Sequence, residues 1–394
     1  MGVSPTASMS GASSQQTNDA IRVMVVDDAL VIRGMLTRFL EESGDISVVA
    51  SVGDGERALA ALDRHDVDVV VLDIEMPRMD GLTALPKIIE KVPGIQVLMA
   101  STLTLRNAEV SLKAMSLGAA DYVPKPSSTG ELRSRDDFKR DLIEKVRTLG
   151  RVGRRRRLRR ERQEAVAGTS GAARARRDTL PETKRVTPAK PVVLRPMKTI
   201  HPEIIAIGSS TGGPQALFRV LKDLPAALKQ PIVITQHMPP TFTTILAEHV
   251  ARASGRPSKE AEDGDVLQPG HIYIAPGDYH MLITKDGIHK KIRLTQDPPE
   301  NFCRPAVDPM LRSLVESYGG SKILAVILTG MGADGSKGAK VVVDDGGVLI
   351  AQDEESSVVW GMPGAVATAG LCSAVLPILE IGPKIKSIAL GGSA

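Results

Sequence analysis

Two groups of polar residues in this sequence have the types and spacing that chemistry requires, and the first combines carboxylates with a lysine. Asp27 and Asp28 follow one apolar run, and Asp73, Ser101 and Lys125 follow three later runs. Carboxylates that converge repel one another unless a cation bridges them, and an oxygen-rich site suits Mg²⁺. A lysine can neutralise an incoming phosphoryl group, and a hydroxyl can hydrogen-bond its oxygens. A single aspartate at a strand end is often a cap or turn residue. Three aspartates, a serine and a lysine at strand ends in this order instead favour phosphoryl transfer to an aspartate.

The second group begins with a serine in a glycine-rich turn. The stretch Gly208–Gly213 reads Gly-Ser-Ser-Thr-Gly-Gly. A phosphate-binding loop needs a lysine where Pro214 stands, so that interpretation fails. The Gly-x-Ser-x-Gly pattern fits instead, because Gly208 and Gly212 leave room for a sharp strand-to-helix turn that presents Ser210. Backbone N–H groups at the start of the following helix can stabilise an oxyanion.

A serine nucleophile needs a base, and the sequence offers seven histidines. His237 directly follows the apolar run Ile232–Gln236, which places it on the same sheet edge as Ser210. Asp334 follows the run that ends at Leu328 and meets the same condition. It would hold the imidazole tautomer while Ser210 attacks an acyl carbon. The chain order Ser, His, Asp differs from that of α/β-hydrolases, so a different fold is expected.

The residues around Asp334 also support a rival hypothesis. Gly330, Gly332 and Gly335 form a Gly-x-Gly-x-x-Gly pattern after an apolar run. Asp353 follows a second run about 20 residues on, as a dinucleotide-binding fingerprint requires. Against this, Asp334 inside the turn would repel a pyrophosphate. The residues alone leave a hydrolase and a NAD-binding protein both open.

Parallel β/α units must position both groups. Apolar runs that alternate with amphipathic stretches predict five strands in the N-terminal half, and the alternation resumes from about Glu203. The predicted strands are Ile21–Val26, Ile46–Val52, Val67–Leu72, Ile95–Ala100, Ala119–Val123, Ile204–Ile207, Ile232–Thr235, Ile323–Leu328 and Val348–Ala351, and helices are predicted after Gly213, over Phe242–Ala253 and near Asp136–Leu149. The expected fold class is α/β, with a doubly wound, flavodoxin-like N-terminal domain and a doubly wound C-terminal domain whose sheet is mainly parallel.

Composition and charge limit the class of protein. The chain has 394 residues, 42% of them hydrophobic, which is typical of globular proteins with more than one domain. Its apolar runs fall short of the about 20 residues that cross a bilayer, so membrane insertion is not expected. Only Cys303 and Cys372 are present, which fits a reducing cytoplasm.

Residues 150–200 differ from the rest, because residues 151–200 hold 16 Lys/Arg against 4 Asp/Glu. The run Arg154–Arg160 and the scattered prolines predict a flexible linker with few apolar residues to order it. A nucleic-acid-binding patch is the alternative, but no aromatic residue interleaves with the arginines for base stacking. Residues 1–19 are expected to form a disordered tail.

Over residues 20–149 the sequence resembles the receiver domain of two-component response regulators. The resemblance is carried by Val25–Asp28, Leu72–Gly81, Ala100–Thr102 and Tyr122–Pro126. It implies that Asp73 is the phosphoacceptor and that Mg²⁺ is held by Asp28, Asp73 and the backbone carbonyl of Glu75, helped by Asp27. It also implies a switch that involves Ser101 and Tyr122 beside Lys125.

The C-terminal domain, expected over residues 201–394, resembles the catalytic domain of the chemotaxis-specific protein-glutamate methylesterases, which are also protein-glutamine deamidases. The matching stretches are Ile207–Gly213, Thr235–Pro239, Tyr273–Met281 and Ile327–Gly335. The resemblance favours the hydrolase over the NAD-binding protein and implies a triad of Ser210, His237 and Asp334. It also implies that Thr211, His280 and Met331 neighbour the active site.

The two resemblances together imply a phosphorylation-activated hydrolase for chemotaxis adaptation. It would release methanol from glutamate methyl esters and deamidate glutamines on the cytoplasmic helices of methyl-accepting chemotaxis receptors. A chemotaxis histidine kinase would be the phosphodonor, the receiver would use Mg²⁺, and the esterase would use no cofactor. A monomer that does not bind nucleic acid is expected. A phospho-dependent binding protein with a vestigial catalytic site is the alternative class, against which the intact triad argues.

Overall fold

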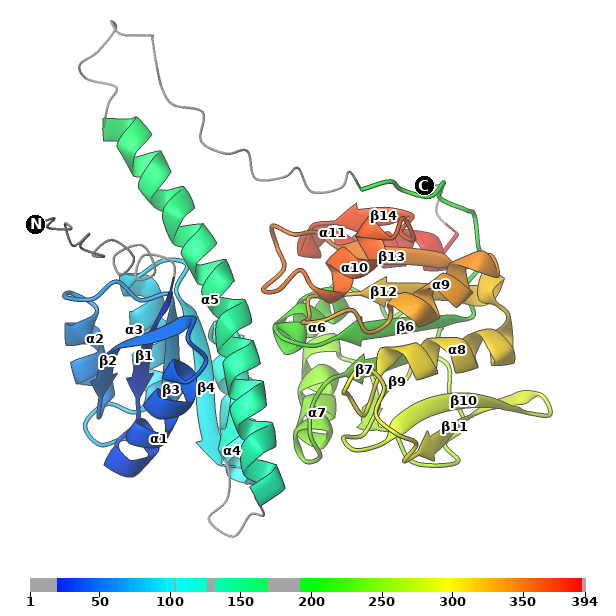
Figure 1. Ribbon diagram of the computed structural model, residues 1–394. Coiled ribbons are helices and arrows are strands. Elements are labelled where there is room, and N and C mark those ends of the chain that lie inside the picture. The colour runs from blue at the N-terminus through cyan, green and yellow to red at the C-terminus, as the bar shows by residue number, and fades with distance from the viewer. Residues whose placement is uncertain (1–19, 103, 126–131, 169–191, 392–394) are drawn as a thin grey trace, which may run out of the picture. The chain divides into compact units, whose positions relative to one another are not determined.

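The computed structural model describes residues 20–102, 104–125, 132–168 and 192–391, which are built around two separate parallel sheets (Figure 1). We refer to residues 20–168 as the N-terminal unit and residues 192–391 as the C-terminal unit. Each unit is an α/β structure, as the alternation of apolar runs and amphipathic stretches predicts.

The sheet of the N-terminal unit has the strand order β2-β1-β3-β4-β5. Its elements are β1 (Ile21–Val26), α1 (Leu30–Glu41), β2 (Ile46–Val52), α2 (Gly55–Ala61), β3 (Val69–Asp73), α3 (Gly81–Lys91), β4 (Gln96–Thr102), α4 (Leu105–Ser116), β5 (Asp121–Lys125) and α5 (Leu132–Gly168). Strand β1 pairs in parallel with both β2 and β3. Because the strand order reverses between β1 and β3, the residues that follow these two strands face one crevice.

Helix α5 corrects the predicted start of the linker. It runs from Leu132 to Gly168, whereas the sequence predicts an irregular linker from residue 150. Arg, Leu, Glu, Gln and Ala are good helix formers, and the Arg157 guanidinium pairs with the buried Asp68 carboxylate at 3.2 Å. Gly153 allows the close approach, because a Cβ atom there would overlap the Asp68 carbonyl oxygen. The rest of the predicted linker up to residue 191 lies outside the described residues, as does the predicted tail 1–19.

The C-terminal unit contains a seven-stranded sheet in the order β14-β13-β12-β6-β7-β9-β8. Its elements are β6 (Ile204–Ser209), α6 (Gly213–Lys222), β7 (Ile232–Gln236), α7 (Phe242–Ser254), β8 (Ser258–Glu260), β9 (Ile272–Ile274), β10 (His280–Asp286), β11 (His289–Thr295), α8 (Val307–Tyr318), β12 (Ile323–Ile327), α9 (Ser336–Asp344), β13 (Val348–Gln352), α10 (Met362–Thr368), β14 (Ala374–Leu376) and α11 (Ile378–Ala389). The strands β6, β7, β12 and β13 are buried along their whole length, which explains why they read as continuous apolar runs.

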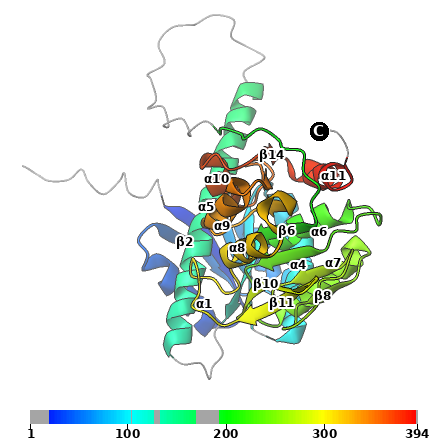
Figure 2. The same cartoon turned by 90° about the vertical axis from the view of Figure 1, so that its right-hand side faces the viewer.

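Helices cover both faces of this sheet (Figures 1 and 2). Helices α6, α7 and α11 pack together on one face, and α8, α9 and α10 pack on the other. A separate antiparallel hairpin, β10–β11, packs beside α8. Among the helices described in both units, none is both long and apolar enough to cross a membrane.

Strand β6 lies between β7 and β12, and the direction of chain winding reverses there. In an open α/β sheet such a reversal opens a crevice at the carboxyl ends of the strands. The turns that follow β6, β7 and β12 carry Ser210, His237 and Asp334, so the fold delivers all three predicted catalytic residues to one edge.

Candidate active sites

Ser210 occupies the turn between β6 and α6. Its backbone N–H donates to the carbonyl of Thr329 at 3.1 Å, and its carbonyl accepts the Gly213 N–H at 2.7 Å. The Gln236 side-chain amide donates to the same carbonyl at 2.9 Å. A Cβ atom at residue 213 would collide with the Gln236 side chain, so the turn requires glycine there. The backbone of this half-buried serine is therefore held by the Thr329 carbonyl after β12, by the Gln236 side chain of β7 and by its own turn.

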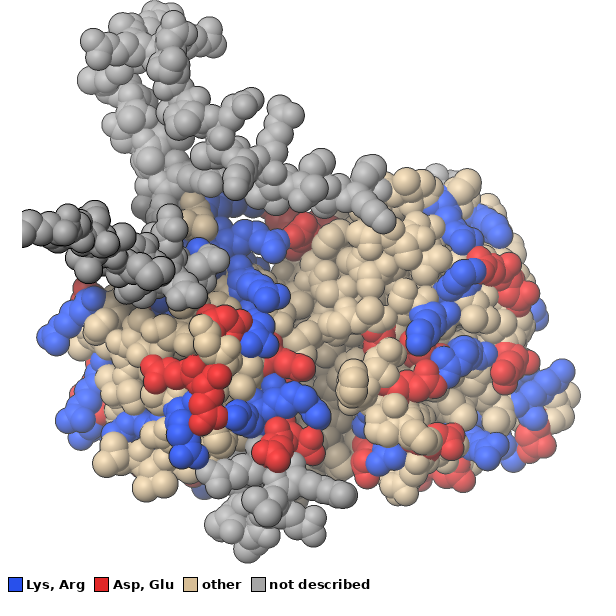
Figure 3. Space-filling model, in the orientation of Figure 1, with Lys and Arg blue, Asp and Glu red and all other residues tan. Residues whose placement is uncertain are grey.

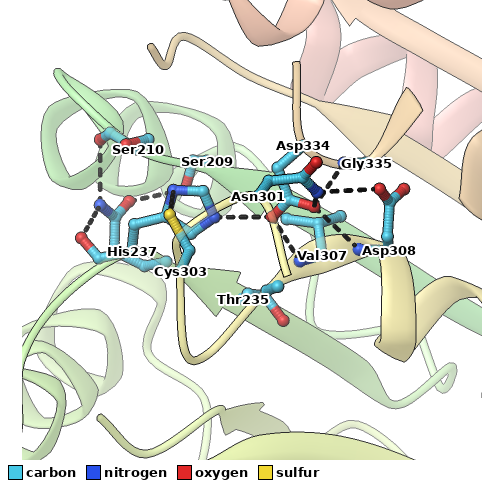
Figure 4. Close-up of polar contacts among 12 residues, drawn as sticks. Ser209, Ser210, Thr235, His237, Asn301, Cys303, Val307, Asp308, Asp334 and Gly335 are labelled. Atoms are coloured by element: carbon cyan, nitrogen blue, oxygen red, sulfur yellow. Dashed lines mark hydrogen bonds and ion pairs between the residues drawn. The ribbon is translucent and has the colours of Figure 1, made fainter. Parts of the chain in front are cut away.

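His237 follows β7, and both of its ring nitrogens have partners (Figure 4). The Nε2 atom lies 2.7 Å from Asp334 Oδ2, and the Nδ1 atom lies 3.4 Å from Cys303 Sγ. Burial of the ring acts to lower the pKa of His237, but the hydrogen bonds to Asp334 and Cys303 outweigh it and raise the pKa above its ordinary value. The imidazolium form is thus strongly stabilised.

Asp334 is held by a set of donors that keep its carboxylate ionised. Four donors besides His237 reach it: the Gly335 N–H at 2.8 Å, the Val307 N–H at 2.6 Å, the Asp308 N–H at 3.2 Å and the Asn301 amide at 2.8 Å. Burial acts to raise the pKa of Asp334, but His237 and the backbone N–H groups of α8 hold it below its usual value. The start of α8 therefore acts as an anion cradle for this carboxylate.

This cradle argues against the dinucleotide hypothesis. A dinucleotide-binding turn offers its free N–H groups to a pyrophosphate. Here the carboxylate of Asp334 takes the Gly335 N–H at the start of α9 as well as two N–H groups of α8. A phosphate group in the same place would meet a buried negative charge instead of free donors.

The structure brings His237 and Asp334 into contact but leaves the Ser210 hydroxyl without a hydrogen bond to His237, within the part of the chain that it describes. Because Nε2 faces Asp334, a nucleophile paired with this ring would use Nδ1, which Cys303 faces in this geometry. Catalytic hydrogen bonds are often long in ligand-free enzymes and tighten when substrate binds. In the structure, the Nδ1 atom of His237 faces a thiol and not the predicted nucleophile.

The sequence reasoning missed Cys303, Asn301 and Asp308. The Asn301 amide bridges two carboxylates, because it donates to Asp334 Oδ1 at 2.8 Å and to Asp308 Oδ2 at 3.0 Å. Burial raises the pKa of Asp308, partly offset by the Gly338 N–H that its other oxygen accepts. Asn301 and Cys303 lie in a loop with no recognisable motif, and Asp308 is in the first turn of α8. No pattern in the sequence signals contacts that span from 7 to 66 positions.

Three further predicted neighbours have distinct positions. His280 is buried, its Nδ1 atom accepts the Ala306 N–H at 3.2 Å, and its Nε2 atom lies 3.2 Å from the Pro298 carbonyl. It thereby fixes both ends of the loop that carries Asn301 and Cys303. Thr211 is buried beside Ser210, and its carbonyl accepts the Thr329 hydroxyl at 2.9 Å. Met331 is half-buried in the turn that precedes Asp334.

The N-terminal unit holds the predicted carboxylate cluster. Ligand oxygens of Asp27, Asp28 and Asp73 lie within 4.8 Å of one another. The Lys125 ammonium contacts Asp27 at 2.5 Å and Asp73 at 2.7 Å. Burial raises the pKa of Asp73, partly offset by Lys125, and the negative charge of Asp27 adds to the rise. Three converging carboxylates are the hard oxygen donors that Mg²⁺ prefers, so this donor set fits the ion.

The other residues that the receiver resemblance implies lie in the strands and turns of the same unit. Ser101 belongs to β4 and Tyr122 to β5, and both side chains are buried. The Lys145 ammonium lies 5.0 Å from the centre of the Tyr122 ring and donates to the Tyr122 carbonyl at 2.7 Å. Glu75 is exposed in the turn after β3.

The N-terminal unit has the carboxylate cluster of a receiver, and the C-terminal unit has the arrangement of residues typical of an ester hydrolase. Together they define a response regulator with a hydrolytic effector domain. The response regulator receiver family matches residues 23–136, and the CheB methylesterase family matches residues 205–385. Two full-length relatives extend the match to nearly the whole chain. The protein-glutamate methylesterase/protein-glutamine glutaminase of Azospirillum brasilense is 57% identical and covers 94% of this chain and 93% of its own. A relative with that name and the suffix 1, from Paramagnetospirillum magneticum, is 57% identical and covers 96% and 98%.

Among solved structures, the catalytic domain of Thermotoga maritima CheB methylesterase covers 48% of this chain and 98% of its own, with 44% identity and a TM-score of 0.46. The family assignment rests on the two full-length relatives. The chain belongs to the CheB methylesterase family, with an N-terminal receiver domain.

Proposed function

We propose that this protein demethylates glutamate methyl esters and deamidates glutamines of chemoreceptors, with Ser210 as nucleophile and with its rate controlled by phosphorylation of Asp73. The reaction class follows from the family. The observation that carries the residue roles is the His237–Asp334 pair at 2.7 Å, whose members follow the two strands, β7 and β12, that flank β6 and its Ser210 turn.

The ester reaction uses these residues in two stages. The Ser210 oxygen attacks the ester carbonyl while His237 Nδ1 takes the hydroxyl proton, and the carbonyl π electrons move onto the oxygen. Backbone N–H groups at the start of α6 face the developing oxyanion. When the C–O bond to the methoxy group breaks, the imidazolium returns its proton and methanol leaves. Water then attacks the acyl-serine with His237 again as base, which yields glutamate and free Ser210.

A glutamine side chain follows the same course, except that ammonia leaves in place of methanol. The raised pKa of His237 favours the imidazolium that forms during attack, and the ionised Asp334 supplies the compensating charge. The same raised pKa limits the fraction of neutral imidazole before attack. Productive binding must therefore turn Nδ1 from Cys303 toward Ser210.

In the receiver, the Asp73 carboxylate attacks the phosphorus of a phosphohistidine supplied by a histidine kinase; the O–P bond forms, the P–N bond breaks and the kinase imidazole leaves. Carboxylates of Asp27, Asp28 and Asp73 and the Glu75 carbonyl would hold Mg²⁺, which when bound neutralises charge on the phosphoryl oxygens. The Lys125 ammonium already pairs with the Asp73 carboxylate, and after phosphorylation it can pair with the phosphoryl oxygens. Ser101 and Tyr122 are the residues we expect to rearrange after phosphorylation.

We expect the protein to act in the cytoplasm, where receptor helices and the kinase are accessible. Basic and acidic side chains are interspersed on the visible face of the C-terminal unit (Figure 3). Such a mixed surface suits a protein substrate better than an extended polyanion, which requires a continuous basic patch.

Product analysis tests the reaction. Purified full-length protein, treated with acetyl phosphate and Mg²⁺, is mixed with membranes that carry methylated chemoreceptors, and methanol and ammonia are measured. We expect the native enzyme to release both methanol and ammonia, and we expect heat-denatured enzyme to release neither. Methylated receptors that stay unchanged at high enzyme concentration would contradict the proposed activity.

A further inference from the structure

The loop beside the catalytic pair contains an exposed aromatic residue in an unfavourable turn position. Glu300 and Cys303 exchange two backbone hydrogen bonds, of 3.1 and 2.9 Å, so Asn301 and Phe302 form a two-residue hairpin turn. Both residues have positive φ, 52° at Asn301 and 64° at Phe302. This combination is typical of a type I′ turn, which favours asparagine at the first position and glycine at the second. Phe302 stands where glycine is preferred.

Three of the four turn residues are fixed to the catalytic region or to α8. The Asn301 amide donates to Asp334, Cys303 Sγ faces His237, and the Glu300 carboxylate pairs with Arg312 of α8. The turn is therefore a rigid part of the rim around the catalytic pair. Phe302 differs from its neighbours, because it is 93% exposed.

A bulky residue at positive φ is strained, and an exposed side chain gains no packing energy in return. A glycine would serve the turn better if the turn only had to hold Asn301 and Cys303. Local violations of this kind are expected at functional positions, where a bound partner compensates for the strain.

We infer that Phe302 is a substrate-recognition residue that packs against an apolar side chain one helical turn from the target glutamyl residue of a helical protein substrate. This inference rests on the proposed function. When a target side chain extends from a substrate helix to the catalytic pair, the helix itself lies next to the rim. Helix residues three or four positions from the target residue lie on the same helix face, about 6 Å from the target residue. An aromatic ring held on the rim by a rigid turn can cover such a neighbour and lose little conformational entropy on binding.

The test compares Phe302→Gly, Phe302→Tyr and wild type as full-length protein, each assayed with and without acetyl phosphate and Mg²⁺. Two substrates are used: methylated receptor membranes and the small ester N-acetylglutamate γ-methyl ester. Ile288→Ala is the matched control, because Ile288 is 91% exposed at the turn between β10 and β11 and has no link to the catalytic pair among its described contacts. Ser210→Ala reports on the chemistry itself.

For Phe302→Gly we expect a KM for receptor about tenfold higher, with kcat within about twofold, as for loss of one aromatic contact in an interface. Hydrolysis of the small ester should be unchanged, the Tm should not fall, and Phe302→Tyr and Ile288→Ala should resemble wild type. Equal losses on both substrates would overturn the inference, because the turn would then only position the triad. So would unchanged receptor kinetics, or a higher rate without phosphodonor, which would indicate that Phe302 serves inhibition by the receiver. Wild-type protein inactive on both substrates would instead contradict the proposed function.

Discussion

The Nδ1 atom of His237 lies 3.4 Å from Cys303 Sγ, on the edge of the ring away from Asp334. The nitrogen to which the proposed mechanism assigns the Ser210 proton thus already has a partner in this geometry. A thiol in this place does two things. It helps to raise the pKa of the base, and it occupies the direction from which the nucleophile must approach.

The first prediction concerns pH. If neutral His237 is the base, as proposed, kcat/KM should rise with pH through the pKa of His237, and the midpoint of that rise should lie above the ordinary histidine value of 6.5. Cys303→Ala removes one cause of the raised pKa. The rise of kcat/KM with pH should therefore have its midpoint at lower pH in Cys303→Ala than in wild type. Identical pH profiles for the two proteins would show that the thiol does not influence the base.

The second prediction concerns the stability of the Asp334 cradle. Asp334→Asn places an amide where N–H donors converge and leaves at least one of them unsatisfied, so we expect a loss of about 3 kcal/mol in the free energy of unfolding at neutral pH. The depressed pKa of Asp334 stabilises the fold above its unfolded value of 3.8, and this contribution is lost as pH falls through the folded pKa. The difference in Tm between the variant and wild type should therefore narrow in acid. Ser210→Ala, which removes no described side-chain hydrogen bond, is the control and should keep the wild-type Tm.

The third prediction concerns control by the receiver. Acetyl phosphate with Mg²⁺ should raise methanol release by wild type but not by Asp73→Ala or Lys125→Ala, because these variants lack the proposed phosphoacceptor or its cationic partner. Asp63→Ala is a matched control, since the Asp63 side chain is 62% exposed and pairs only with Lys91 among its described contacts. A fragment that begins at Lys198 should be faster than the unphosphorylated full-length protein. If the fragment is no faster, the receiver recruits the enzyme and does not inhibit it.

The arrangement of strands was accessible from the sequence because buried parallel strands are continuous apolar runs. All nine predicted strands are present, with shifted ends for several of them, and His237 and Asp334 could be placed on one edge before any contact was known. The length of helix α5 was underestimated because its second half is highly charged and contacts a residue far away in the sequence, through the Arg157–Asp68 pair and the close approach of Gly153 to Asp68. Neither feature has a recognisable pattern.

The loop that carries Asn301 and Cys303 could not be predicted for a different reason. Its contacts join residues that are 33 and 66 positions apart, and hydrogen bonds to His237 and Asp334 fix its conformation. Sequence periodicity reports which elements form and which face is buried, but it does not report how an irregular loop folds over an active site. His280, which the family resemblance implies as a neighbour, holds that loop through its two ring nitrogens.

The most direct test of the account is methanol release from methylated receptors by Ser210→Ala and Cys303→Ala, measured side by side after phosphodonor treatment. The Cys303 thiol faces the His237 imidazole, but we assign nucleophilic attack to Ser210 alone. Ser210→Ala should fall by at least about 10³-fold, as for loss of a catalytic nucleophile, while Cys303→Ala should stay within about tenfold of wild type. Retained activity in Ser210→Ala together with its loss in Cys303→Ala would contradict the account and would identify the thiol as the nucleophile.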